Sequence, residues 1–469
     1  MTVNIPLEIR KLLYVQNPKK TSVTSAISDL RRLYSNGLLN QQQIFKDQQI
    51  HHKIETKNIY ISEIKSINTQ LKKTENESEK RKLRIQKNEI FKQKEGLEEI
   101  IQNHRETNHA IINGISNKIN AHLSSQKKTE KLLGTLMLNY STEDSNLRML
   151  VNSQTKPIYQ TTLISLMLKD LIDSKYNFKN SKIKSIVNNL EIPKEGKRTD
   201  IQENYEILCE QLFTPITQAI YIHQLGLNSP QSKKILEENE QTLNDKQRIE
   251  YLKTSQLKSL EFLMYGINVI RPKLDTKQQE TEWIQESKSK ILFIRDIIKS
   301  INSGKGELGE IIKVCQQYTA LIIQDKPKYN SGLEIHAYQL MQSRAKEKKI
   351  NPIFTERLLS TMGQFPIGTG ILTYESDYSS IEKAIVTKLY PKNPKEPTIR
   401  KVTRRELYQR PKSEETLQQK NNLIFTFKNI PKDLQEKYKN QPTNQNNKPM
   451  LFWKPNSVFG NRIQEQHLW

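Results

Sequence analysis

The chain has 469 residues, enough for two or three domains that each bury a core. Only 35% of the residues are hydrophobic, 27% are charged and 15 are glycine, which favours long, partly solvated helices over a single compact enzyme. We expect no membrane span, because no run of 18 apolar residues occurs, and no signal peptide. The two cysteines, Cys209 and Cys315, are far apart and form no disulfide or metal pattern, which fits a reducing cytoplasm.

The formal net charge of +23 is the second constraint on function. Such an excess favours contact with nucleic acid, anionic lipid headgroups or an acidic protein surface. It would also follow from the Lys-, Asn- and Ile-rich usage of an AT-rich genome, without any partner. Because the charge is spread along the chain and not gathered in one tract, the case for nucleic acid is weakened, and both explanations stay open.

Residues 1–40 predict two short amphipathic helices, broken at Asn17–Pro18 and at Asn36–Gly37. Ser22 or Thr24 is placed to cap the second helix. A helix-turn-helix DNA-binding motif needs two such helices, but two short helices alone are a weak signal for it.

Residues 41–139 predict a long helical arm. No proline stands between Pro18 and Pro157, so helices can run far without a break. Around the wholly polar segment "KKTENESEKRK", apolar residues recur at steps of three, four and seven. This pattern predicts a helical hairpin or an interrupted coiled coil with a narrow seam, packed on its own return helix or on another subunit. The apolar positions are Ile54, Ile61, Ile64, Leu71, Leu83, Ile90, Leu97, Ile112, Ile115, Ile119 and Leu123.

The remaining chain changes pattern twice. Residues 140–364 contain broader apolar faces, each about one helix long, and predict an all-α bundle of about six to eight helices. Residues 365–402 alternate apolar and polar positions between glycine and proline turns, which predicts a small β extension of two or three strands. Residues 403–469 predict a basic, partly flexible tail, with linkers at "QRPKSEETLQQKNN" and "KNQPTNQNNKPM" and an aromatic end that docks on the body or on a partner. The expected fold is therefore mainly α.

Three stretches carry a family resemblance. "AIYIHQLGL" ends a helix with His223–Gln224, "IIKVCQQYTALIIQDKPKY" is a later helix, and "FPIGTGILTYES" is a junction before the β extension. In this order, residues 205–402 resemble the HD-GYP branch of the HD-domain phosphohydrolases, whose active members cleave cyclic di-GMP at a centre of two or three metal ions. The resemblance implies an HD-like bundle over 140–364. It assigns the family junction motif to Phe365, Pro366, Ile367, Gly368 and Thr369.

The same resemblance marks where catalysis would have been lost. The family's His-Asp pair falls on His223 and Gln224, and a later metal-binding aspartate falls on Gln316. A neutral amide cannot supply the charge that holds two divalent ions close together. We therefore expect no catalytic residue, no metal and no cofactor, with His223 as a packed or hydrogen-bonded helix-end residue. We also expect Gln224 and Gln316 to hydrogen-bond each other.

Other family features are missing from the sequence. Leu227 replaces a basic residue, and the short "INSGKGELGE" replaces the Gly-Tyr-Pro loop that grips the substrate. Its glycines and lysine also lack the spacing of a phosphate-binding loop. Neither the interval from His122 to His223 nor that from His223 to His336 contains a further histidine.

Residues 392–412 are the densest basic stretch, with eight Lys or Arg against two Glu. The candidate anion contacts in it are Arg400, Lys401, Arg404 and Arg405. A solvated rim of the β extension is the simpler interpretation.

The sequence thus predicts a non-enzymatic, HD-GYP-like scaffold or regulatory protein of the bacterial cytoplasm, alone or peripheral to a membrane-associated machine for motility, pilus assembly or secretion. Its partners would be other proteins, engaged through the arm and the tail, and the chain would be an oligomer or a complex subunit. The first alternative is a non-hydrolytic sensor of cyclic di-GMP or another nucleotide. The second, less favoured, is a nucleic-acid-binding protein.

Overall fold

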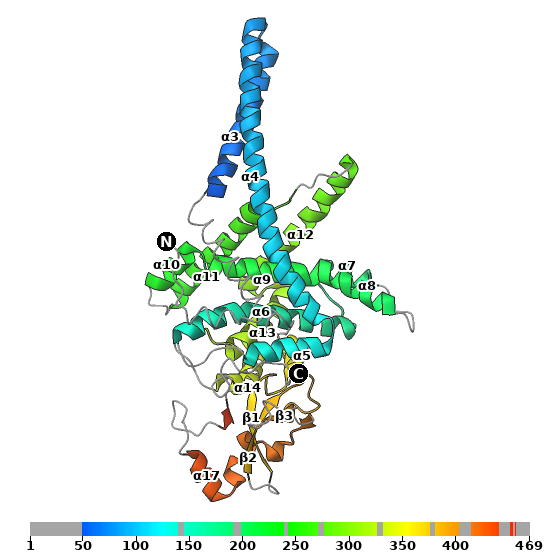
Figure 1. Ribbon diagram of the computed structural model, residues 1–469, viewed down its shortest axis with the longest axis vertical. Helices are drawn as coiled ribbons and strands as arrows, with labels where there is room; N and C mark the ends of the chain where they lie inside the picture. Colours follow the sequence, from blue (N-terminus) through cyan, green and yellow to red (C-terminus); the bar gives the residue numbers. More distant parts are fainter. Residues whose placement is uncertain are drawn as a thin grey trace, which may run out of the picture. The chain divides into compact units, whose positions relative to one another are not determined.

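A computed structural model gives the fold (Figure 1). It describes residues 49–138, 145–190, 198–238, 243–270, 276–325, 332–375, 380–402, 414–439, 451–453 and 455. The helices expected in 1–40 lie outside these residues. The described chain is mainly helical, with a long pair of helices and a small C-terminal antiparallel sheet, which confirms the expected fold class. Among the described helices, none has both the length and the apolar content to cross a bilayer.

The chain divides into two compact units, each built from segments far apart in the sequence. The described parts of 35–116 and 214–302 form one unit, here called the arm unit. The described parts of 117–213 and 303–469 belong to the other, here called the sheet unit.

Two long neighbouring helices form the arm, α3 (Gln49–Lys73) and α4 (Glu77–Leu123) (Figure 1). The turn between them falls inside the polar segment "KKTENESEKRK", and the side chain of Asn76 caps α4 by accepting a hydrogen bond from the Ser78 amide at 2.9 Å. An ion pair of 3.1 Å between Lys57 and Glu98 joins the two helices. The arm therefore adopts the hairpin form of the predicted helical pair.

The rest of the arm unit consists of α9 (Thr214–Leu227), α10 (Pro230–Glu238), α11 (Asp245–Phe262), the π-helical turn η2 (Leu263–Ile267) and α12 (Lys277–Ser303). Helices α9 and α11 meet at Gly226, where a Cβ atom would overlap the Ser259 hydroxyl and the Ser255 carbonyl. The buried Ser232 hydroxyl donates to the Gly226 carbonyl at 2.8 Å. Small residues with satisfied hydroxyls thus permit the close approach of these helices.

The helices of the sheet unit surround α6 (Ser145–Asp173), which is buried on nearly every side of its second half. Helix α13 (Gly306–Ile322) packs against it, and beyond α13 the Gln324 carbonyl accepts a 2.7 Å hydrogen bond from Asn152. A 2.8 Å ion pair joins Lys156 to Asp325. The other helical elements are α5 (Gln126–Leu138), α7 (Ser181–Asn188), α8 (Arg198–Leu208), η1 (Cys209–Phe213), α14 (Leu333–Lys346) and α15 (Pro352–Met362).

The sheet has five antiparallel strands in the order β4-β3-β2-β1-β5. Three of them lie within the predicted β extension, namely β1 (Gly370–Glu375), β2 (Ser380–Val386) and β3 (Thr398–Val402). The other two, β4 (Glu415–Thr416) and β5 (Phe452–Trp453), come from the region predicted as linker and tail. The three-stranded form predicted for residues 365–402 is thus present, and the region predicted as tail adds two strands, one of them Phe452–Trp453 at the start of the aromatic end.

Both faces of the sheet carry a hydrophobic cluster. One contains Leu372, Ile385, Val402, Leu423 and Trp453, and the other contains Ile371, Ala384, Ile399 and Leu417. The segment that follows β4 contains η4 (Gln419–Asn421), α16 (Leu423–Thr426), η5 (Phe427–Asn429) and α17 (Lys432–Lys439). Helix α16 supplies residues to both clusters, whereas η5 and α17 supply Phe427 and Leu434 to the first. Part of the predicted linker is therefore folded core, because its apolar residues cover strands that would otherwise be exposed.

Candidate functional site

The three residues that the family resemblance singles out lie on two helices. His223, on α9, is only 3% exposed, and burial lowers the pKa of its imidazole to about 4. Its Nδ1 atom has no hydrogen-bond partner in the described chain. Gln224 follows it in α9, whereas Gln316 lies on α13, and both are half-buried. The two glutamines belong to different units, and the hydrogen bond between them stays a prediction.

At neutral pH the His223 imidazole is uncharged, because burial in a low-dielectric interior disfavours the protonated form. Within the described residues, no group of three or more His, Cys, Asp or Glu side chains is arranged to hold a metal ion.

The stretch from Phe365 to Thr369, which resembles the family's junction motif, connects α15 to β1. Gly368 has φ 87°, and a Cβ there would lie 2.7 Å from the Gly134 carbonyl of α5, so the position requires glycine. Its amide donates to the Val386 carbonyl at 2.9 Å. Phe365 is buried and packs edge-on against Phe425 at 6.0 Å between ring centroids. In this chain the motif joins the helices of the sheet unit to its sheet.

Two of the four candidate anion contacts lie on β3. The Lys401 ammonium is 3.1 Å from Glu382 and 3.2 Å from Glu415, on the neighbouring strands. Arg400 points to the other face, where its guanidinium is 3.4 Å from Glu414. Both cations are therefore matched by carboxylates inside the sheet unit. Arg404 and Arg405 lie outside the described residues.

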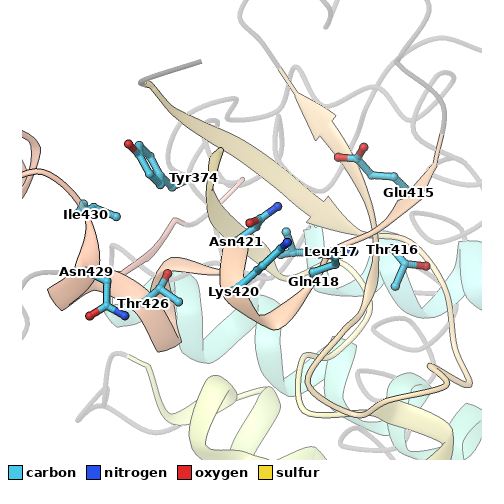
Figure 2. Close-up of a pocket in the computed structure, with 10 residues that line it drawn as sticks. All are labelled: Tyr374, Glu415, Thr416, Leu417, Gln418, Lys420, Asn421, Thr426, Asn429 and Ile430. Atoms are coloured by element: carbon cyan, nitrogen blue, oxygen red, sulfur yellow. The ribbon is translucent and has the colours of Figure 1, made fainter. Parts of the chain in front are cut away.

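An open pocket of about 560 Å³ lies beside β4 and the segment after it (Figure 2). In Figure 2, Tyr374 and Ile430 lie at one end and Glu415 at the other, with Lys420 between them. The buried side chains of Leu417 and Ile430 provide apolar surface. The full lining is Tyr374, Glu415, Thr416, Leu417, Gln418, Lys420, Asn421, Thr426, Asn429 and Ile430.

The polar side chains of this pocket are mostly unpaired. Gln418, Asn421 and Asn429 each carry a carboxamide that makes no hydrogen bond to another described residue. Lys420 lacks a carboxylate within ion-pair distance in the same part of the chain, whereas Glu415 is paired with Lys401. The pocket thus offers amide donors and acceptors, one free cation and an apolar wall, the mixture typical of ligand sites.

Sequence reasoning missed this pocket because it took residues 409–422 for a linker. The available signal was the apolar Leu417 and the run 423–425 next to an amide-rich stretch, since a solvated linker has no need for large apolar side chains.

It also missed a set of contacts in the arm unit. Asn108 of α4 is buried and donates a 2.7 Å hydrogen bond to the Gly266 carbonyl, and the His109 Nε2 atom lies 3.0 Å from the Asn268 carbonyl. These side chains satisfy carbonyls at the end of η2 that have no partner in their own helix.

Comparisons of the chain with protein-family models, with curated proteins and with solved structures gave no match. The resemblance to HD-GYP proteins therefore rests on the quoted sequence stretches alone.

Proposed function

We propose that the chain is a non-catalytic assembly protein that self-associates through the α3–α4 arm. The observation that carries this proposal is the incomplete burial of the arm's own seam. Seven apolar seam residues stay partly exposed, and of the other apolar side chains between 52 and 101 only Ile67 and Ile101 are buried. The seven are Ile54, Ile61, Ile64, Leu71, Leu83, Ile90 and Leu97.

Two helices can cover a narrow seam from one side only, and a second pair of helices would cover the other side, as in a four-helix bundle. Ile85 and Ile100 of α4 are 53% and 45% exposed and add apolar surface outside the seam. A second copy of the arm is the occupant that fits, because a two-fold arrangement matches the same surface on both partners.

The charge of the arm supports pairing between like arms. Residues 49–101 contain 12 Lys or Arg and 9 Glu, which gives +3, whereas the whole chain carries +23. A nearly balanced surface permits two identical arms to approach without strong repulsion. The proposed setting, a bacterial machine for motility, pilus assembly or secretion, rests on the family resemblance.

Sedimentation of the full chain tests the arm proposal. We expect a dimer at low micromolar concentration, and a dissociation constant at least about 100-fold higher for the double variant Ile85→Glu/Ile100→Glu, because carboxylates would replace buried apolar surface on both partners. Ile353→Glu is the matched control, since Ile353 is 63% exposed on α15, outside the arm. A wild-type monomer at about 100 µM, or equal weakening by the control, would contradict the proposal.

The proposed lack of catalytic activity is tested separately. Elemental analysis of the purified full chain should find no stoichiometric iron or manganese, and incubation with cyclic di-GMP should leave the nucleotide intact. Stoichiometric metal together with hydrolysis would restore the phosphodiesterase interpretation.

A further inference from the structure

We propose that the pocket beside β4 binds an extended, acidic peptide segment of a partner protein. This inference does not depend on association through the arm. It uses three observations on the sheet unit: the position of the pocket at a sheet edge, its unpaired carboxamides and its free lysine.

One end of the pocket lies at an edge of the sheet, and the lining extends from there to Tyr374 of β1. Strand β4 ends the strand order, so no described strand lies beyond it, and its two residues, Glu415 and Thr416, line the pocket. At the β4 end an extended peptide would meet the main-chain groups of an edge strand, a surface on which such peptides commonly bind. In Figure 2 the lining residues follow one another from this edge toward Tyr374, which suits a linear ligand better than a compact one.

The carboxamides match a peptide main chain. Each of Gln418, Asn421 and Asn429 offers an N–H donor and a C=O acceptor, the same pair that a peptide group presents. Because these side chains make no hydrogen bond to other described residues, binding would not require them to break one. Side-chain amides of this kind recognise peptide groups without regard to the peptide's side chains.

The charges select an acidic peptide. Lys420 is exposed and has no carboxylate partner in the described chain, whereas Glu415, the acidic residue of the lining, is held by Lys401 at 3.2 Å. The net charge of +23 adds a long-range attraction for acidic partners. An apolar residue of the peptide would contact the half-buried Tyr374 and the buried Leu417 and Ile430.

A nucleotide is the competing ligand, because an aromatic ring, amides and a lysine also suit a base and a phosphate. The single free cation and the linear arrangement of the lining favour the peptide. Competition between a bound peptide and an added nucleotide distinguishes the two ligands.

Fluorescence anisotropy of the full chain tests the proposal. The probe is a fluorescein-labelled peptide of about eight residues in which Asp or Glu alternates with Leu or Val, so that charged and apolar side chains point to opposite sides. We expect micromolar affinity that weakens as salt rises, and much weaker binding of peptides with Asn and Gln, or with Lys, in the acidic positions.

Three variants localise the binding. Lys420→Glu should weaken it about tenfold, and Gln418→Ala/Asn429→Ala should weaken it by a similar factor through lost hydrogen bonds. Lys428→Glu makes the same charge change at an exposed position outside the lining, and should change affinity less than about twofold. All four side chains are exposed, so the core is left intact, which thermal unfolding would verify.

Three results would overturn the proposal. The first is that acidic, neutral and basic peptides bind equally well, or that none of them binds. The second is that Lys420→Glu and Lys428→Glu change the affinity equally. The third is that micromolar GMP or cyclic di-GMP displaces the peptide, which would assign the pocket to a nucleotide.

Discussion

The arm and the C-terminal sheet differ in the contacts that stabilise each of them. The arm is a pair of neighbouring helices whose seam residues stay partly exposed, joined by the ion pair between Lys57 and Glu98. The sheet is buried on both faces, and its last strand comes from residues 452–453, far from its partner β1. Substitutions should therefore have small effects in the arm and large effects in the sheet.

The largest expected effect is in the sheet. Trp453 is 6% exposed, and its indole N–H donates to the carbonyls of Ile371 at 3.1 Å and Ala384 at 3.0 Å. Trp453→Ala should lower the free energy of unfolding of this unit by about 3–5 kcal/mol, measured by urea denaturation. Trp283→Ala is the control, because Trp283 is 46% exposed on α12 and its loss should cost less than about 1 kcal/mol. Equal losses of unfolding free energy in the two variants would show that the burial of Trp453 does not decide its effect.

The second effect compares a buried histidine with an exposed one. Burial lowers the pKa of His223 to about 4, against about 6.5 in the unfolded chain. Between these pH values the unfolded chain binds the proton and the folded chain does not. The free energy of unfolding should therefore fall as pH decreases from about 6.5, by about 3 kcal/mol in total near pH 4.

His223→Leu should remove this pH-dependent loss, as measured by urea denaturation between pH 7 and about pH 4. His52→Leu, at an exposed position on α3, should retain it. Burial also lowers the pKa of His104 and His122, and these residues give both variants the same background slope. If His223→Leu keeps the full pH dependence, the His223 imidazole is not a neutral, buried group.

The smallest effect compares two glycines of the arm unit. Gly96 of α4 has open space around its Cβ position, so Gly96→Ala should raise the free energy of unfolding by up to about 1 kcal/mol. Gly226→Ala would press a methyl group into α11 and should lower it by about 1–3 kcal/mol. Thermal unfolding of both variants checks the opposite signs. A lower free energy of unfolding for Gly96→Ala would mean that another surface packs against the arm at that position.

The arm was predictable because its information is local. A seven-residue repeat and a polar interruption are properties of adjacent residues, and they locate α3, the turn near Asn76 and α4. The alternation over 370–402 likewise predicted β1, β2 and β3, since each strand shows its own buried positions.

The sheet's outer strands were not predictable in the same way. A two-residue strand such as β4 or β5 has no periodicity, and its conformation is set by the partner strand that it meets. Because β4 lines the pocket, a prediction that omits this strand also omits the pocket. The contacts of Asn108 and His109 with the end of η2 join residues about 158 positions apart, and no spacing in the sequence indicates them.

The indole of Trp453 also bears on the order of folding. It bonds to a carbonyl 82 residues earlier in the chain, whereas α3 and α4 meet across a tight turn. Contacts between distant residues require closure of a long loop and form slowly, so we expect the hairpin to form before the sheet. On that route β1 would keep an unpaired edge until Phe452 and Trp453 pair with it, and an unpaired edge favours misassembly.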